Sequence, residues 1–109
     1  HDPTAHAEIV AIRSACRRLG TFQLTGCVVY ASAEPCPMCL GAIYWARPKR
    51  VVFAATRQDA ARAGFDDAFI YGELARAPAR RRIPFVRLDV PDAQAPFRAW
   101  RADPARTRY

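Results

Sequence analysis

The stretch Pro35-Cys36-Pro37-Met38-Cys39 decides how this chain of 109 residues is organised. Cys36 and Cys39 lie three positions apart, so a helix that begins here places both sulfurs on one side of its first turn. Pro37 favours a helix start, because a proline at the first helical position gives up an N–H that has no partner within the helix. The positive end of the helix dipole favours thiolate, the form of cysteine that binds metal. The stretch therefore predicts two metal ligands at the start of a helix.

A second stretch upstream, His6-Ala7-Glu8, completes the predicted metal site. The imidazole of His6 adds a third ligand, and three protein ligands on zinc leave a fourth position open for water, as in catalytic sites. Residues two apart on a helix do not share a face, so Glu8 is a poor fourth ligand beside His6. Its carboxylate is better suited to take a proton from zinc-bound water and pass it to a leaving group. His-x-Glu together with Pro-Cys-x-x-Cys is the signature of zinc nucleobase deaminases.

Each of these residues also has a simpler interpretation. Cys-x-x-Cys alone occurs in redox motifs and in structural zinc sites. His6 could cap a helix or lie at the surface, and Glu8 could be a first-turn carboxylate that the helix dipole stabilises. The two motifs together favour a catalytic zinc site over these alternatives.

The composition predicts one small globular domain. Hydrophobic residues make up 51% of the chain, but no run of 18 or more apolar residues is present that could cross a membrane. The chain opens with His1 rather than Met, close to His6, so we expect an N-terminal portion to be missing; no signal peptide is visible. Cys16 and Cys27 are expected to be small buried apolar residues rather than a disulfide pair, which favours a reducing, cytoplasmic location.

The net charge of +7 raises the question of nucleic-acid binding. Lys49 is the only lysine, and the abundance of arginine, alanine and proline is the pattern that a codon bias toward G and C would produce. The one dense basic run, Arg80-Arg81-Arg82, has no neighbouring aromatic residues to stack on bases. We therefore expect no functional nucleic-acid surface.

The apolar pattern predicts helices alternating with strands, which is typical of a layered α/β fold. Asp2 is expected to be the N-cap and Pro3 the first residue of a helix closed by Gly20, with His6 and Glu8 in its first turn. The expected elements are a helix over 4–19, a buried strand over 27–31, a helix over about 37–46 buried on more than one side, a buried strand over 51–54, a helix capped by Asp66 or Asp67, a third strand over 85–88, and a last helix after Pro96.

Several segments resemble the cytidine-deaminase-like superfamily, in its branch with guanine and tRNA-adenosine deaminases. The two zinc motifs, within 2–8 and 34–39, carry the superfamily resemblance. Three further segments, 40–48, 63–67 and 96–100 with the terminal Tyr109, are similar to the bacterial guanine deaminases, and the similarity covers essentially the whole chain. The resemblance implies a three-layer α/β/α cytidine-deaminase-like fold. The N-terminal helix and strand hairpin of that family, with an asparagine that binds the base, are absent from this chain.

The resemblance also implies an activity and a set of site residues. The reaction would be the hydrolysis of guanine to xanthine and ammonia, with Zn²⁺ held by His6, Cys36 and Cys39. Glu8 would be the proton shuttle, and Asp67 would bind the base near its amino group and help to carry protons. Residues that contact substrate would be Ala7, Trp45, Phe65, Asp67 and Tyr109. The family implies homodimers that exchange C-terminal segments, so that Trp45 and Tyr109 would reach into a pocket from a partner subunit.

Alternatives remain open for the later residues and for the activity. Asp67 could simply cap a helix, Trp45 could serve core or dimer packing, and Tyr109 could be a frayed terminus. The same zinc chemistry would suit a tRNA-adenosine deaminase, or a deaminase of small rings such as cytosine or triazines. A zinc-stabilised binding module without catalysis is a further alternative.

Overall fold

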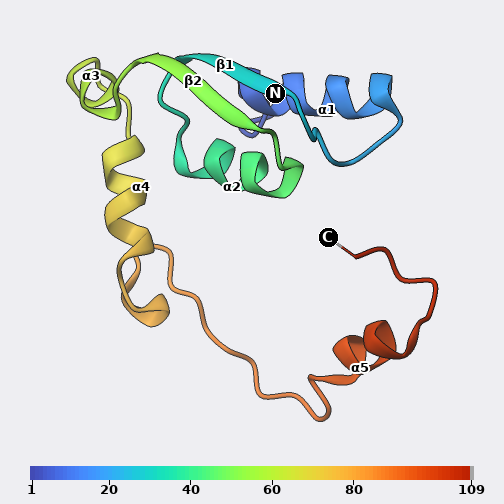
Figure 1. Cartoon of the computed structure of the whole chain (residues 1–109). Helices are drawn as coiled ribbons and strands as arrows, with labels where there is room; N and C mark the ends of the chain where they lie inside the picture. The colour runs from blue at the N-terminus through green and yellow to red at the C-terminus, as the bar shows by residue number, and fades with distance from the viewer. Residues whose placement is uncertain (109) are drawn as a thin grey trace. The chain divides into compact units, whose positions relative to one another are not determined.

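The computed structural model describes residues 1–108. They form two compact units, His1–Ala75 and a second unit that begins at Arg76. The elements in chain order are α1 (Ala7–Leu19), β1 (Val28–Ala33), α2 (Pro37–Ala46), β2 (Arg50–Ala55), α3 (Arg57–Arg62), α4 (Asp67–Leu74), the 3-10 helix η1 (Pro78–Arg80) and α5 (Ala95–Ala102), as Figure 1 shows. In the part of the chain that the structure describes, every helix is too short or too polar to pass through a bilayer.

Two parallel strands form the sheet of the first unit. β1 pairs with β2 in a register that runs from Val28 opposite Arg50 to Ala33 opposite Ala55, and Figure 1 shows the two arrows side by side. Parallel strands need a crossover connection, which α2 provides here. Both predicted strands are confirmed, each a little longer or shifted. The prediction that they are buried is wrong, because no residue of either strand is buried and each strand of a two-stranded sheet keeps one edge unpaired.

Helix α1 begins later than the sequence predicts. Asp2 does not cap it: its Oδ1 accepts hydrogen bonds from the N–H and the hydroxyl of Thr4, at 2.8 and 2.7 Å, which forms a tight turn instead. The helix starts at Ala7 and His6 is its N-cap residue, with an extended backbone at φ −62° and ψ 154°. His6 therefore lies just outside the helix and Glu8 within its first turn. The predicted end is confirmed, since Gly20 adopts the left-handed conformation and its N–H bonds the carbonyl of Cys16.

Helix α2 spans the predicted residues and begins at Pro37, with Cys36 as its N-cap residue. It buries one stripe, made of Cys39, Ile43 and Ala46, which recur at helical spacing. The expectation of burial on more than one side is wrong for this chain alone, because Tyr44 and Trp45 are 75% and 65% exposed. Its opposite face is thus left open to solvent.

The core of the first unit is built around the two motif cysteines. Ile9 of α1 packs with Cys36 and Cys39, and Met38 and Ala42 lie against this cluster. Cys39 is completely buried. Helices α1 and α2 contact each other, so the core lies between the helix that follows His6 and the helix that carries the cysteines.

Two further helices complete the first unit. α3 begins with a capping box in which the hydroxyl of Thr56 accepts from the N–H of Asp59 while the Asp59 carboxylate accepts from the N–H of Thr56. α4 starts at Asp67 with Asp66 at the N-cap position, but no side chain caps it by a hydrogen bond. Helix α4 was predicted from the sequence, whereas α3 was not.

The second unit contains η1 and α5. The predicted last helix is confirmed, with Pro96 in its first turn. The predicted third strand over 85–88 is wrong, because these residues are exposed and form no strand. A strand needs a neighbour to pair with, and the described residues of this unit offer no other strand.

Candidate metal centre and active site

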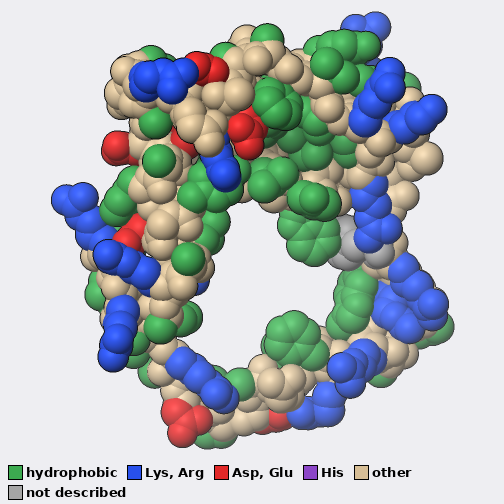
Figure 2. Space-filling model, turned by 60° about the vertical axis from the view of Figure 1, so that its left-hand side comes forward, with side chains coloured by type: hydrophobic (Ala, Val, Ile, Leu, Met, Phe, Trp, Pro, Cys, Tyr) green, Lys and Arg blue, Asp and Glu red, His purple; other side chains and the backbone are tan. Residues whose placement is uncertain are grey.

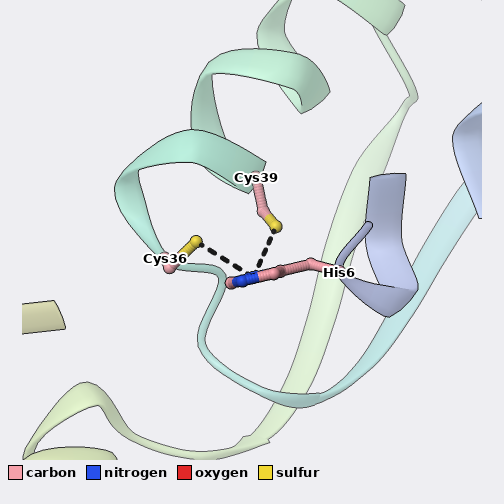
Figure 3. A group of neighbouring side chains, drawn as sticks. All are labelled: His6, Cys36 and Cys39. Carbon is pink, nitrogen blue, oxygen red and sulfur yellow. Dashed lines mark hydrogen bonds between the residues drawn. The ribbon is translucent and has the colours of Figure 1, made fainter. Parts of the chain in front are cut away.

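Three side chains from distant parts of the sequence converge on one point. The Sγ atoms of Cys36 and Cys39 lie 3.5 and 3.6 Å from Nδ1 of His6, as the dashed lines in Figure 3 show. All three candidate ligand atoms lie within 4.8 Å of one another. His6 is exposed and both cysteines are buried, so the group has one open side and one side closed by the core.

The spacing of these atoms fits a tetrahedral zinc ion. With Zn–S bonds of about 2.3 Å and a Zn–N bond of about 2.0 Å, tetrahedral angles place sulfur and nitrogen about 3.5 Å apart. The two observed S···N distances agree with that value. Two thiolates and one imidazole are a typical donor set for zinc, and three ligands leave a fourth position open. The residues therefore fit a zinc ion with an accessible coordination position.

The local structure explains why the ligands meet. Cys36 is the N-cap residue of α2 and Cys39 lies one turn further on, so both sulfurs lie at the same end of the helix. His6 is the N-cap residue of α1, and its helix packs against α2 through Ile9. The predicted trio is thus brought together by the ends of two packed helices.

Burial acts against the ionisation of Cys39 in the absence of metal. Desolvation is the main reason that the pKa of its thiol is raised, and the neighbouring Cys36 sulfur and the Glu8 carboxylate add to the effect. Zinc binding must therefore displace a proton from Cys39. The contribution of Glu8 also shows that its carboxylate lies close to the metal ligands.

A cleft of about 540 Å³ opens beside the metal ligands, a size within the range of about 300–1,000 Å³ that is typical of small-molecule sites. Its walls come from α1, β1 and the loop after it, α3, and the segment that enters α4. The lining residues are His6, Ala7, Glu8, Ala11, Val29, Tyr30, Ala31, Ser32, Ala33, Glu34, Cys36, Ala60, Phe65 and Asp67.

The structure brings most of the predicted site residues to this cleft. Ala7, Glu8, Phe65 and Asp67 all line it next to His6 and Cys36. Trp45 is not among its lining residues and projects from the exposed face of α2. The predicted substrate contact of Tyr109 lies outside the residues that the structure describes.

Several lining residues were missed by the sequence analysis. They are Ala11 of α1, residues 29–33 of β1, Glu34 in the loop that follows, and Ala60 of α3. Sites in open α/β sheets lie at the carboxyl ends of strands, so the position of Ser32 and Glu34 between a predicted strand and the Cys36 helix was a usable signal. Ala60 carried no such signal, because α3 itself was not predicted.

Comparison with known proteins identifies the family. Residues 1–55, half of the chain, match the model of the cytidine and deoxycytidylate deaminase zinc-binding region. The chain belongs to this deaminase family. Residues 1–55 of this chain, which match the family model, contain all three candidate zinc ligands and Glu8. The zinc predicted from the sequence is therefore confirmed as the metal of this region.

Relatives within the deaminase family support the fold. Guanine deaminase of Bacillus subtilis is 58% identical over 101 residues, which cover 93% of this chain and 65% of that enzyme. Its crystal structure matches with a TM-score of 0.94 and 56% identity, over 99% of this chain and 69% of the other. The predicted cytidine-deaminase-like fold is thereby confirmed. The tRNA-specific adenosine deaminase of Aquifex aeolicus is 54% identical over 54 residues, which cover 50% of this chain and 36% of that enzyme.

Proposed function

We propose that this protein is a zinc-dependent guanine deaminase, which hydrolyses guanine to xanthine and ammonia. The observation that carries the proposal is the cleft that Glu8, Phe65 and Asp67 line together with two of the candidate zinc ligands, His6 and Cys36. The identity of 58% to Bacillus subtilis guanine deaminase supports the choice of substrate. The chain spans 65% of the length of that relative. We propose that its residues form a single deaminase domain.

The chemistry that zinc supplies when bound is Lewis-acid activation of water at neutral pH. Glu8 lines the cleft and interacts with Cys39, so its carboxylate can remove a proton at the metal and deliver it to the amino group that leaves as ammonia. One water is consumed for each ammonia released. The buried cysteines keep one side of the site dry, which strengthens the electrostatic interactions within it.

The proposed substrate contacts follow from the chemistry of a purine ring, which has two apolar faces and polar edges. Phe65 offers an aromatic face and Asp67 a hydrogen-bond acceptor for the amino group and ring N–H groups of guanine, and Ala7 leaves room beside the metal ligands. Trp45 and Tyr109 are proposed to complete the pocket of a partner subunit.

We also propose a homodimer with exchanged C-terminal segments. Large apolar side chains are exposed on both units. Among them are Tyr44 and Trp45 on α2 and Ile83, Val86 and Leu88 in the second unit, and Figure 2 shows hydrophobic side chains at the surface among Lys and Arg side chains. Exposed apolar side chains in this number support a protein–protein contact. The expected result of light scattering on the purified protein is twice the mass of one chain; a monomer at micromolar concentration would contradict the dimer.

Exchange of segments has its own test. If Glu8 of one chain and Tyr109 of its partner serve one pocket, mixed dimers of Glu8→Gln and Tyr109→Ala chains contain one intact pocket. Mixing two nearly inactive proteins and allowing them to re-associate should then restore activity toward half of the wild-type value per dimer that carries one chain of each kind. No recovery on mixing would show that each pocket uses its own Tyr109.

The proposed location is the cytoplasm, in purine catabolism. All four cysteines, Cys16, Cys27, Cys36 and Cys39, are free thiols in the structure, and free thiols with zinc-ligating cysteines suit a reducing compartment.

The proposed function is tested by assay of the zinc-loaded protein on guanine and on a tRNA anticodon stem-loop that contains adenosine. We expect xanthine and ammonia from guanine and no inosine from the RNA. The second candidate is a tRNA-adenosine deaminase, which the match of half of this chain to the Aquifex aeolicus enzyme favours. Turnover of the RNA without turnover of guanine would decide for that candidate.

A further inference from the structure

The carboxylate of Glu34 joins two segments that meet at the cleft. Glu34 lies two residues before Cys36, in the loop between β1 and α2. Its Oε2 accepts a hydrogen bond from the backbone N–H of Arg57, the first residue of α3, with an N···O distance of 3.0 Å. Its own N–H donates to the carbonyl oxygen of Ala55 at the end of β2, at 2.8 Å. The loop that carries Cys36 is therefore fastened to the junction of β2 and α3 at two points.

Burial does little to hold helix α3 in place. None of its residues is buried, so apolar packing contributes little to its position. The bonds between Thr56 and Asp59 lie within its own first turn and do not connect it to another element. The first N–H groups of a helix lack partners within the helix, so the Glu34 carboxylate both satisfies one of them and is favoured by the helix dipole.

Arg57 also contacts α4, which lies next to the residues that line the cleft on the side of α3. The Arg57 guanidinium lies over the ring of Tyr71 in α4, 5.0 Å from its centroid, a cation–π contact between the two helices. α3 supplies Ala60 to the cleft, and the segment that enters α4 supplies Phe65 and Asp67. These three residues are defined here as the α3–α4 wall. Any displacement of Arg57 would carry the α3–α4 wall with it.

We propose that Glu34 is a positioning residue, which sets the distance between the α3–α4 wall and the metal ligands. Its carboxylate links the loop of Cys36 to the start of α3 and acts on the substrate through the wall. The backbone bond from Glu34 to Ala55 persists when the side chain is changed, so the metal loop keeps its own anchor. Loss of the carboxylate should therefore loosen the wall and leave zinc in place. The effect on catalysis rests on the proposed function, whereas the effect on the wall does not.

The test compares three zinc-loaded variants with the wild type: Glu34→Ala, Glu34→Gln and, as a control for the loss of an exposed carboxylate, Asp89→Ala. Amide hydrogen exchange over residues 57–67 should accelerate about tenfold or more in Glu34→Ala, with one zinc per chain retained. KM for guanine should rise about tenfold while kcat stays within about threefold of the wild type. Glu34→Gln keeps an oxygen acceptor and should restore both values to within about threefold; Asp89→Ala should match the wild type.

Other outcomes would overturn the inference. Unchanged exchange over 57–67 in Glu34→Ala would show that the carboxylate does not hold the wall, and loss of zinc would show that it serves the metal loop. A fall in kcat with an unchanged KM would also contradict it. Should Glu34→Ala fail to fold, Glu34→Asp takes its place, because its shorter side chain withdraws the carboxylate from the N–H of Arg57. Accelerated exchange over 57–67 in Glu34→Asp supports the link, and wild-type exchange contradicts it. If the wild-type protein does not deaminate guanine, the proposed function is wrong. Amide hydrogen exchange over 57–67 then still tests whether the Glu34 carboxylate holds the α3–α4 wall.

Discussion

At the scale of single residues, Glu8 is the side chain on which the proposed chemistry depends most. Its carboxylate lines the cleft beside His6 and lies close enough to Cys39 to raise the pKa of that thiol. Glu8→Gln keeps the size of the side chain and removes its capacity to accept a proton. We expect the variant to retain one zinc per chain and to lose about 10²- to 10⁴-fold in kcat, the usual contribution of general acid–base catalysis. Metal analysis and steady-state kinetics measure the two values; undiminished deamination would exclude the shuttle role.

Asp67 and its neighbour Asp66 provide a matched pair of carboxylates. Asp67 lines the cleft, whereas Asp66 is the N-cap residue of α4, is not among the lining residues and makes no capping bond. A charged hydrogen bond to the substrate contributes about 1.5–3 kcal/mol, so Asp67→Asn should lower kcat/KM for guanine by at least about tenfold. Asp66→Asn should change it by less than about threefold. Equal effects of the two substitutions would mean that Asp67 acts only as part of the helix start.

The sequence predicts three candidate zinc ligands that the structure places together, because a zinc site imposes both residue types and spacing. Cys36 and Cys39 need only one helical turn to present two sulfurs, and Pro37 marks the start of that turn, so local sequence is sufficient. The contact of Glu34 could not be predicted from the sequence. Its partner is a backbone N–H at Arg57, and a backbone group leaves no mark in the sequence that would reveal the contact.

At the scale of secondary structure, α3 depends on its capping box. The Asp59 carboxylate accepts hydrogen bonds from the hydroxyl and the N–H of Thr56, and these bonds lower its pKa below the ordinary value of 3.8. A lowered pKa in the folded state means that the stabilisation is complete above 3.8 and is lost as the pH falls through the lower value. NMR titration of the Asp59 carboxyl carbon should show a midpoint below 3.8, and Thr56→Ala should move it back toward 3.8. A midpoint above 3.8 in the wild type would be incompatible with the capping box.

The helices and strands that were predicted correctly depend on residues nearby in the sequence, whereas those that were missed or misplaced depend on other contacts. α2 and the end of α1 at Gly20 depend on nearby residues and were predicted. The start of α1 was misplaced because Asp2 is used by Thr4, two residues away, rather than by the helix. The strand expected over 85–88 failed for the opposite reason: its apolar alternation fits a strand, but pairing depends on a neighbour that the sequence alone does not supply.

At the scale of the whole chain, few of the described residues are buried, and two of the three candidate zinc ligands, Cys36 and Cys39, are among them. The buried apolar residues of the described chain are Ile9, Leu24, Pro35, Cys36, Cys39, Ile43 and Ala46. Zinc bound only to the folded state stabilises it by about 4 kcal/mol at a free concentration of 1,000 times Kd, and each kcal/mol shifts the Tm of a small domain by about 4–8 °C. Removal of zinc by a chelator should therefore lower Tm by at least about 15 °C, reversibly on addition of zinc and not of magnesium. Thermal unfolding monitored by circular dichroism measures Tm with and without zinc. An unchanged Tm would mean that the fold does not depend on the metal.

The packing of Ile9 against the two ligand cysteines also has a cellular consequence. In newly made chains without zinc, Ile9, Cys36 and Cys39 would not pack together stably. Quality-control proteases degrade such chains in proportion to the fraction of time that they are unfolded. The number of copies present in a cell would then rise and fall with the supply of the metal, before any regulation of the gene. The zinc supply of the cell, acting through Cys36 and Cys39, would then determine the amount of this protein.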